Sequence, residues 1–294
     1  MSCVDIEKYI KESGKIIERE LELCFENSDE DIKSIYDAMA YSTLGGGKRI
    51  RAFLVLEFCR LFGGDTAAAK KLACSLEMIH AFSLIHDDLP CMDDDDMRRG
   101  KPSCHKKFGE AQALIAGDAL IMLAFETASR ASDDAKISLD AVRLLSENAG
   151  ARGMCGGQSM DMYAESTRVS YEYLIKLQAL KTGALIEAGA LLGCICARAD
   201  EQKMQDARRY AMCIGRAFQI IDDILDVEGD EASLGKRIGS DRDSDKSTFV
   251  TELGIDGARA EAVRLSEEAK TCVAKYEGSD ALCALSDWLC NRRY

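Results

Sequence analysis

The chain contains the sequence MIHAFSLIHDDLPCMDDDDMRRGKPSCH, residues 78–105, in which an apolar helical pattern runs into a dense group of aspartates. The spacing of the apolar residues predicts a buried helix that continues to Asp87 and Asp88. Pro90 ends this helix, because proline steers the preceding residue out of helical geometry and its ring blocks the turn before it. A buried helix therefore brings six aspartates, the last four at 93–96, to one of its ends.

Helical spacing of apolar residues continues outward from this segment over almost the whole chain. Strand patterns are scarce and the sequence has only two prolines, which favours long helices. Helices are predicted near 3–26, 30–43, 48–63, 66–88, 109–131, 134–150, 170–197, 201–228, 255–275 and 279–291. Polar or glycine-rich connections are predicted at 93–108, 153–169 and 229–248. The expected fold class is all-α, with residues 1–294 in one domain, since single domains can reach this length.

The composition argues against several classes of protein. There are 38 Lys and Arg against 51 Asp and Glu, and the net charge of −13 makes nucleic acid an unexpected partner. The 13 cysteines include no CxxC pair and follow no secretory signal, so we expect reduced thiols and a cytoplasmic protein. The most apolar segment, 182–199, carries Glu187 and is barely long enough to span a bilayer. A core helix is expected there, and no membrane span.

The aspartates at 87–96 are too crowded to be stable without a counter-charge. Neighbouring carboxylates raise one another's pKa and destabilise the fold unless a cation neutralises them. A solvated surface loop is the alternative, but Asp87 and Asp88 lie within an apolar run. Asp87 and Asp93 would point about 240° apart on a regular helix, so they can share an ion only because Pro90 breaks it. Mg²⁺, which prefers oxygen ligands and often bridges carboxylates to phosphates, is the expected ion.

Two other ligand-binding motifs are excluded by residue type. An EF-hand loop beginning at Asp95 would place Met97 and Arg99 at ligand positions, where neither side chain can bind calcium. A P-loop over GGGKRIR, residues 45–51, fails because Ser42 stands where glycine is needed and Arg49 where Ser or Thr is needed.

A second acidic cluster lies in FQIIDDILDVEGD, residues 218–230, on another apolar helix. Asp222 and Asp226 are four residues apart, so their carboxylates lie on one helix face and can share a metal ion. Such a pattern alone also occurs on ordinary surface helices. Two such clusters at the ends of long apolar helices suggest that they face one another across a cavity.

Basic residues accompany both clusters and predict phosphate binding. Arginine grips phosphates with two parallel hydrogen bonds, and a glycine-flanked helix start adds backbone donors. Each basic residue alone could be a surface charge, but their joint placement favours two phosphate sites. They are Lys48, Arg49, Arg51, Arg98, Arg99, Lys181 and Lys236.

These motifs together resemble the trans-prenyltransferases, specifically the bacterial farnesyl diphosphate synthase type. The resemblance covers most of the chain and is carried by GGGKRIR at 45–51, residues 78–105, FGEAQALIAGDAL at 108–120, GMCGGQSMDM at 153–162, KTGALIEAG at 181–189, FQIIDDILDVEGD at 218–230, LGKRIGSD at 234–241 and DSDKSTF at 243–249. It implies a bundle of long helices around a deep cavity, a homodimer, and two substrates, isopentenyl diphosphate and an allylic prenyl diphosphate.

The resemblance also implies a role for each matching residue. Asp87 and Asp93 would bind two Mg²⁺ ions and Asp222 a third, with Asp88, Asp223 and Asp226 supporting them. Arg98, Lys181 and Lys236 would hold the allylic diphosphate, with Lys246 nearby as a further substrate-binding residue. Thr182 and Gln219 would line the reacting carbon, and Lys48, Arg51, His80 and Arg99 would hold isopentenyl diphosphate. Two other roles are open to His80 besides binding diphosphate: it could act as the general base, or it could be an ordinary histidine of the core.

Rival functions remain at this point. A terpene cyclase also ionises an allylic diphosphate, but it needs one diphosphate site, whereas Lys48, Arg51 and Arg99 suggest a second. A non-catalytic partner subunit could lose its aspartates, and this chain keeps both sets. Phe82 lies five residues before Asp87, about 7.5 Å down the helix, where the resemblance associates an aromatic residue with C15 products. Phe82 is alternatively a simple core aromatic, and a C20 product is the alternative outcome.

Overall fold

The computed structural model describes residues 4–27, 29–165, 167–228 and 248–292, and within them the protein is all-α apart from one short β-ribbon. The elements are α1 (Ile6–Cys24), η1 (Glu30–Ile32), α2 (Lys33–Thr43), α3 (Ile50–Leu61), α4 (Thr66–Asp87), β1 (Met97–Arg98), β2 (Lys101–Pro102), α5 (Cys104–Phe108), α6 (Glu110–Ser129), α7 (Ala135–Ala149), α8 (Met154–Glu165), α9 (Tyr171–Gln178), η2 (Ala179–Gly183), α10 (Ala184–Cys196), α11 (Glu201–Glu228), α14 (Phe249–Val273) and α15 (Asp280–Asn291).

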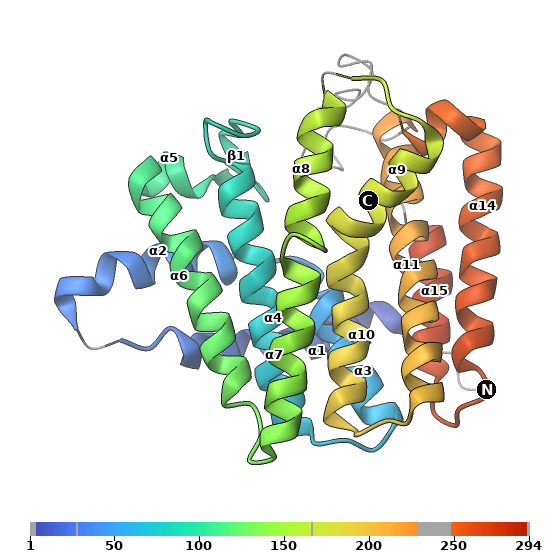
Figure 1. Ribbon diagram of the computed structural model, residues 1–294, viewed down its shortest axis with the longest axis horizontal. Coiled ribbons are helices and arrows are strands. Elements are labelled where there is room, and N and C mark those ends of the chain that lie inside the picture. Colours follow the sequence, from blue (N-terminus) through green and yellow to red (C-terminus); the bar gives the residue numbers. More distant parts are fainter. Residues whose placement is uncertain (1–3, 28, 166, 229–247, 293–294) are drawn as a thin grey trace.

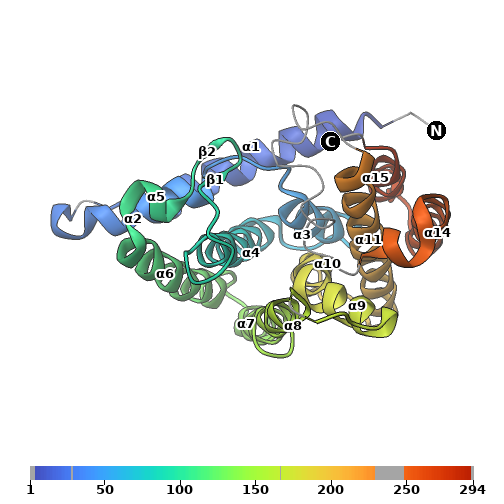
Figure 2. The same cartoon turned by 90° about the horizontal axis from the view of Figure 1, so that it is seen from above.

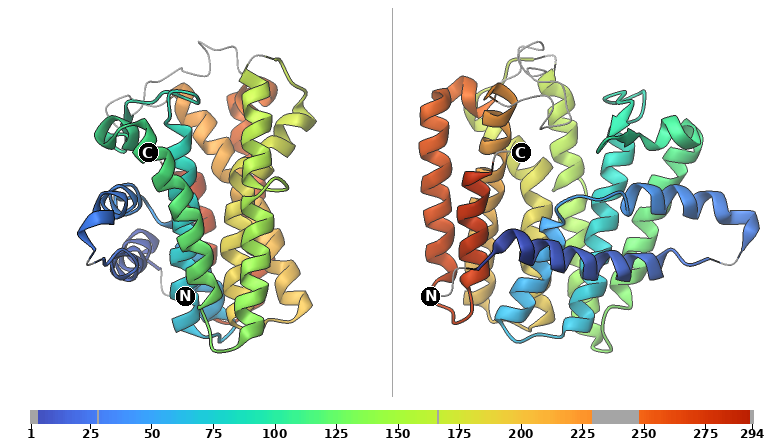
Figure 3. Two further views of the ribbon diagram at one scale, coloured as in Figure 1. Left: turned by 60° about the vertical axis from the view of Figure 1, so that its left-hand side comes forward. Right: turned by 180° about the vertical axis from the view of Figure 1, so that it is seen from behind.

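The long helices stand roughly side by side (Figure 1). Viewed from above, α3, α4 and α10 occupy the middle, α6 to α9 follow one side, and α11, α14 and α15 close one end (Figure 2). Helix α1 runs across the bundle rather than along it (Figure 3). The central position of α4 and α10 follows from their sequences, because a helix that is apolar all round must be covered on every side.

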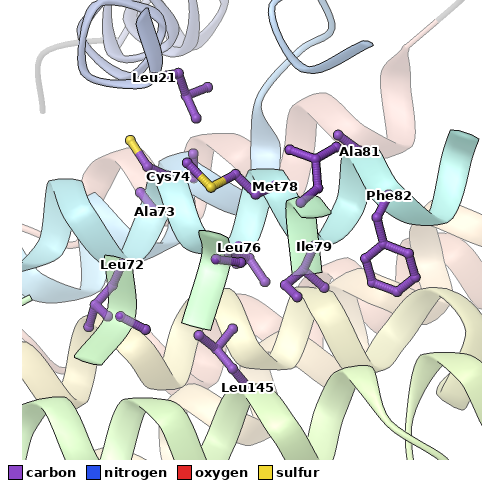
Figure 4. Packing of buried hydrophobic residues seen from close by; sticks show 14 of the residues in the cluster. Leu21, Leu72, Ala73, Cys74, Leu76, Met78, Ile79, Ala81, Phe82 and Leu145 are labelled. Atoms are coloured by element: carbon purple, nitrogen blue, oxygen red, sulfur yellow. The ribbon is translucent and has the colours of Figure 1, made fainter. Parts of the chain in front are cut away.

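Close contact between α10 and α3 depends on two glycines. A Cβ atom on Gly189 would lie 2.8 Å from the carbonyl oxygen of Arg51, and one on Gly193 would lie 2.5 Å from that of Val55. The glycines thus let α10 lie against the backbone of the helix that carries Arg51. On the other side, buried residues of α4 pack against neighbouring helices, and Leu76, Ile79 and Phe82 project from α4 on one side (Figure 4).

The all-α prediction is confirmed, but the connection predicted at 153–169 is wrong, because residues 154–165 form α8. Gly156 and Gly157 suggested a loop, yet they serve close packing within and beside a helix. A Cβ atom on Gly157 would lie 2.2 Å from the backbone nitrogen of Lys181. Adjacent glycines are typical of loops, but they also occur where a helix packs closely on its neighbour, so the sequence alone could not distinguish the two.

Three other boundaries differ from the prediction. The helix predicted at 170–197 is interrupted by the π turn η2, and the connection at 93–108 contains β1, β2 and α5. Helix α14 begins at Phe249 rather than near 255, and it is kinked at Gly254, whose φ of 68° lies in the left-handed region. A positive φ is rare inside helices, and glycine tolerates it because it has no Cβ atom.

Two stretches are long and apolar enough to cross a membrane by length and composition, namely Glu110–Ser129 and Tyr171–Cys196. In the second stretch, 61% of an 18-residue apolar segment is buried inside the protein, as in the core helix of a bundle. In the first stretch, Glu110–Ser129, which is α6, only 33% of the corresponding 18-residue segment is buried. Helix α6 therefore carries apolar surface that the described part of the chain leaves uncovered.

Candidate active site

The first aspartate motif folds back on the end of α4. The helix ends at Asp87, and the backbone N–H of Asp93 then donates to the carbonyl oxygen of Asp87 at 2.9 Å. Burial raises the pKa of Asp87 to about 6; the nearby Lys181 ammonium opposes this shift and the Asp93 carboxylate adds to it. The predicted break after Asp87 is thus confirmed, and it brings two carboxylates together where the charged form of Asp87 is unfavourable.

Asp87 opens onto a cavity of about 540 Å³, here called the main cavity. Most of its wall comes from α4, α8 and η2, with Arg51 added from α3. The lining residues are Arg51, His80, Phe82, Ser83, Leu84, His86, Asp87, Met92, Met154, Cys155, Gln158, Ser159, Met162, Lys181 and Thr182. Phe82 is buried and its ring meets that of His86 edge to face, with centroids 5.7 Å apart.

Lys181 and Thr182 reach the main cavity from the π turn η2. A π turn widens the helix by one residue and is frequent at functional sites. The ammonium nitrogen of Lys181 lies 2.5 Å from Asp161 Oδ2 on α8. Burial opposes the charge on Lys181, but Asp161, Asp87 and Asp93 outweigh it and raise the pKa. Lys181 is therefore a charged ammonium group, positioned by Asp161, that faces the first aspartate motif.

The second acidic cluster is joined to the π turn through Gln219. Thr182 Oγ1 donates to Gln219 Oε1 at 3.4 Å, and Gln219 Nε2 donates to Asp223 Oδ1 at 3.0 Å. Asp223 is buried and also accepts the backbone N–H of Phe249 at 2.8 Å. Asp223 thus fixes the start of α14, whereas the side chain of Asp222 is 41% exposed and remains accessible to an ion.

Arg292, which follows α15, forms an ion pair with Asp222 and was not predicted from the sequence. Its guanidinium lies over the ring of Phe218, with the carbon 4.0 Å from the ring centroid, and donates to the Phe218 carbonyl oxygen at 2.8 Å. The two arginines that follow α15 in the sequence are the only signal that could have found it. Arg292 thus supplies a counter-charge to Asp222, one member of the second acidic cluster.

A second cavity of about 360 Å³, here called the basic cavity, lies beside the main cavity and shares Arg51 and His80 with it. The structure brings together here the four residues that the family resemblance assigned to one diphosphate, namely Lys48, Arg51, His80 and Arg99. The full lining is Gly47, Lys48, Arg49, Ile50, Arg51, Glu77, His80, Arg99, Ile186, Ile214, Phe218 and Arg292.

The electrostatics of the basic cavity favour an anion. Burial lowers the pKa of Arg51, and the Nε atom of Arg51 is buried without a hydrogen-bond partner in the described part of the chain. Burial, together with Arg51 and Arg99, holds the pKa of His80 well below its usual value, so His80 is neutral. The pKa of Lys48 is also lowered, mainly by burial and then by the positive charge of Arg292. Buried cations that repel one another are stabilised by a bound polyanion.

Arg98 and Arg99 are neighbours in sequence but have different partners. Arg98 Nε donates to Asp88 Oδ1 at 2.9 Å, and its other nitrogen reaches Asp95. Arg99 has a φ of 51° and donates to the carbonyl oxygen of Gly46. Arg99 therefore lines the basic cavity, whereas Arg98 lies against the buried Asp88 and lines neither the main nor the basic cavity.

Two groups of residues complete the comparison with the sequence-based prediction. Lys236 and Lys246 lie outside the described residues. Conversely, the face of α8 that lines the main cavity was not predicted, because residues 153–169 were expected to form a connection. That face comprises Met154, Cys155, Gln158, Ser159 and Met162.

The acidic residues suit a hard divalent cation. The carboxylate of Asp87 is held in its unfavourable charged form, and Asp226 Oδ2 is buried without a hydrogen-bond partner among the described residues. Both observations indicate sites where a positive charge is missing. Asp87, Asp93 and Asp222 offer only oxygen ligands, which is the donor type that Mg²⁺ prefers.

Comparisons with known proteins agree with this geometry. The polyprenyl synthetase family model matches residues 32–279. The chain is 42% identical over 282 residues to the farnesyl diphosphate synthase of Haemophilus influenzae, covering 94% of this chain and 95% of that protein. It is 43% identical over 267 residues to the chloroplastic geranylgeranyl pyrophosphate synthase of Catharanthus roseus, covering 88% and 74%.

A solved structure shows the same fold with ligands. The geranyltransferase of Helicobacter pylori, complexed with magnesium and isoprenyl diphosphate, superposes with a TM-score of 0.83 at 31% identity and covers 98% of this chain and 97% of that one. The resemblance inferred from the motifs is therefore confirmed over nearly the full chain. The protein belongs to the polyprenyl synthetase family and is a prenyltransferase of the farnesyl or geranylgeranyl diphosphate synthase type.

Proposed function

We propose that this protein is a farnesyl diphosphate synthase, which joins isopentenyl diphosphate to dimethylallyl and then to geranyl diphosphate and releases pyrophosphate at each step. The observation that carries the C15 product is the position of Phe82. It lines the main cavity on the same helix as Asp87 and five residues before it, with its side chain buried. A prenyl tail that runs from Asp87 down the cavity meets this ring, which limits its length.

The two cavities suit two diphosphates. We infer that the allylic substrate lies in the main cavity, with its diphosphate near Lys181 and the first aspartate motif, and that isopentenyl diphosphate lies in the basic cavity. Because Arg51 and His80 border both cavities, the two substrates would meet there. A cyclase needs no second diphosphate site, so the basic cavity favours a synthase.

The proposed reaction has three steps. The bond between the allylic carbon and oxygen breaks, and its electron pair leaves with pyrophosphate, whose charge Lys181 stabilises. Carbon four of isopentenyl diphosphate then attacks the allylic cation beside Thr182 and Gln219. A proton leaves carbon two to the pyrophosphate and the new double bond forms. His80 is a poor base because buried arginines surround it, so it is assigned to hold diphosphate.

Three Mg²⁺ ions per site are proposed, two at Asp87 and Asp93 and one at Asp222. When bound, Mg²⁺ acts as a Lewis acid that stabilises charge on the departing pyrophosphate. Asp88 and Asp223 are already engaged with Arg98 and with Gln219, so their role is to position the neighbouring ligands. Arg292 would have to give up its ion pair when an ion binds Asp222.

One assay tests the proposed function. The protein is incubated with Mg²⁺, isopentenyl diphosphate and geranyl diphosphate, and the dephosphorylated products are separated by chromatography. Farnesol as the main product is expected. Mainly geranylgeraniol would replace the proposal by a C20 synthase, like the relative from Catharanthus roseus. A cyclic hydrocarbon formed without isopentenyl diphosphate would indicate a cyclase, and no product at all a non-catalytic partner subunit.

The two neighbouring arginines are expected to affect different substrates. Arg99→Ala removes a cation from the basic cavity and should chiefly raise the KM for isopentenyl diphosphate, by roughly tenfold or more. Arg98→Ala leaves Asp88 buried without its partner and should chiefly impair use of the allylic substrate. Initial rates with each substrate varied in turn measure both effects. Equal changes for both substrates in both variants would contradict this division.

A homodimer is proposed from the uncovered apolar face of α6, which lies on the outside of the bundle (Figure 2). Leu114, Ile115 and Met122 on this helix are 46%, 51% and 66% exposed. Ile115 and Met122 are seven residues apart and share a helix face. Exposed apolar patches of this kind mark interaction sites, and a second copy of the chain is the proposed partner. A cytoplasmic location is proposed separately, from the 13 cysteines that include no CxxC pair.

Charges on the α6 face should therefore produce monomers. The double variant Ile115→Asp, Met122→Asp is expected to sediment as a monomer at micromolar concentration, while the wild-type protein sediments as a dimer. Val263→Asp is the matched control, because Val263 on α14 is 54% exposed and α14 lies at the opposite end of the bundle from α6 (Figure 2). A monomeric wild-type protein, or a dimeric double variant, would rule out this interface.

A further inference from the structure

Asp94, Asp96 and His105 place one potential metal-binding atom each within 4.8 Å of one another. Asp94 and Asp96 lie just before β1, and His105 lies in α5 just after β2, so the three meet at the base of the β-ribbon (Figure 1). None of them lines the main cavity or the basic cavity. This group therefore belongs to neither of the two substrate cavities.

His105 is the unusual member of the group, because its side chain is only 2% exposed. Its Nδ1 atom lies 3.1 Å from Ser103 Oγ, which fixes the orientation of the ring. Its Nε2 atom is buried without a hydrogen-bond partner among the described residues, and leaving a buried polar atom unpaired costs about 1–3 kcal/mol. The ring therefore carries an unpaired nitrogen within the group formed with the Asp94 and Asp96 carboxylates.

The separation of these atoms suits an ion between them. Nε2 of His105 lies 3.9 Å from Asp94 Oδ1, too far for a hydrogen bond. Two ligand atoms that are each about 2.1 Å from a metal ion lie roughly 3.0–4.2 Å apart. Asp94 and Asp96 are exposed, so small rotations of their side chains can bring all three ligand atoms within this range. Asp96 Oδ1 also accepts from Lys106 at 2.7 Å, which leaves its second oxygen for an ion.

We propose that Asp94, Asp96 and His105 bind one divalent transition-metal ion at a site separate from the magnesium ligands Asp87, Asp93 and Asp222. Two carboxylates and one imidazole, completed by water, suit Mn²⁺, Co²⁺ or Zn²⁺ better than Mg²⁺, which prefers oxygen alone. Ser103 supplies the outer hydrogen bond that commonly orients a metal-binding histidine. Asp95 is not a ligand, because it is turned toward Arg98.

An ion at this site would clamp the two ends of the β-ribbon together. The ribbon consists of only two residue pairs, Met97 with Pro102 and Arg98 with Lys101, so it has few hydrogen bonds of its own. Arg98 and Arg99 lie between the ligands in sequence. The ion would therefore hold both arginines in place, and only this consequence rests on the proposed roles of Arg98 and Arg99.

Cobalt is a suitable probe because its visible absorption reports the ligands directly. Co²⁺ is titrated into the untagged, EDTA-treated and dialysed full-length protein in the absence of diphosphates. We expect one strongly bound equivalent, with an affinity that falls at least tenfold in His105→Gln. Asp95→Asn is the matched control, since it removes one charge from the same loop without removing a ligand, and Asp87→Asn tests the neighbouring magnesium site. Both should keep the cobalt signal.

A second variant guards against a folding defect in His105→Gln. Asp94 is exposed, so Asp94→Asn should fold normally and still weaken cobalt binding. Co²⁺ should also raise the melting temperature of the wild-type protein but not of Asp94→Asn or His105→Gln. The proposal is overturned if no cobalt binds without diphosphate, if Asp94→Asn and His105→Gln bind it as well as the wild type, or if Asp87→Asn abolishes the signal.

Discussion

Asp87→Asn is expected to lower turnover by about a hundredfold to a thousandfold while making the metal-free protein more stable. The loss of turnover follows because Asp87 is a proposed ligand of the ions that stabilise the departing pyrophosphate, and single contacts of this kind are worth about 10²–10³ in rate. Initial rates in saturating Mg²⁺ measure it. Near-normal turnover, or full activity of the wild-type protein in EDTA, would refute the metal assignment.

The gain in stability follows from the pKa of Asp87. Burial, reinforced by Asp93, raises that pKa from 3.8 to about 6 in the folded protein, so ionising Asp87 costs free energy only in the folded state. The folded protein therefore loses stability as pH rises from about 4 to 6, and the loss is complete above pH 6. Asparagine has no charge to bury, and the variant should gain on the order of 2 kcal/mol above pH 6.

Urea unfolding in EDTA at pH 5 and pH 7.5 measures this gain. The difference between Asp87→Asn and the wild type should be larger at pH 7.5 and should shrink as pH falls below 6. Asp133→Asn is the matched control, because Asp133 is exposed and far from both acidic clusters in sequence. A variant less stable than the wild type at pH 7.5 would show that Asp87 is not held in an unfavourable charged form.

Phe82→Ala is expected to shift the main product from C15 to C20 or longer. The ring lies in the wall of the main cavity with 7% of its surface exposed, so its removal opens space along α4 beyond Ser83 and Asp87. Product chromatography after incubation with excess isopentenyl diphosphate measures the shift. If the C15 fraction is unchanged in the variant, Phe82 does not end the cavity.

The same substitution should also cost stability, which requires a control. Removing a buried phenylalanine typically costs about 3–5 kcal/mol, so folding of Phe82→Ala is checked by circular dichroism and the assay is run at low temperature. Phe62→Ala removes an equal side chain that packs on Tyr276, away from the main cavity. It should lower stability without changing product length. A shift to C20 in Phe62→Ala as well would attribute the effect to loosening of the fold.

Local patterns predicted much of the fold and part of the site. The helical spacing of apolar residues predicted the long helices, and Pro90 predicted the end of α4 after which the chain turns back and Asp93 bonds to Asp87. Both effects act over a few neighbouring residues. The gathering of Lys48, Arg51, His80 and Arg99 followed from the resemblance to a family. Spacing alone could not have predicted it, since these residues come from separate segments of the chain.

Other features depend on contacts that no local pattern shows. Helix α8 was missed because Gly156 and Gly157 have the composition of a loop, and the backbone of Lys181 that requires Gly157 is distant in sequence. Arg292 was missed because its partner Asp222 lies on another helix. The buried Nε2 atom of His105 was also invisible, since burial of a short polar segment is decided by the helices around it.

The π turn η2 sets the rotation of α9 relative to α10. Each residue of an α-helix turns the chain by about 100°, so the extra residue in η2 shifts the apolar stripe of α9 by that angle against the stripe of α10. Leu174 and Leu177 form the buried face of α9, and a rotation of this size would move them off it. The direction of the Lys181 side chain thus depends on the number of residues in η2. Inserting or deleting a residue in Ala179–Gly183 should therefore be tolerated less well than substituting most of the residues within it.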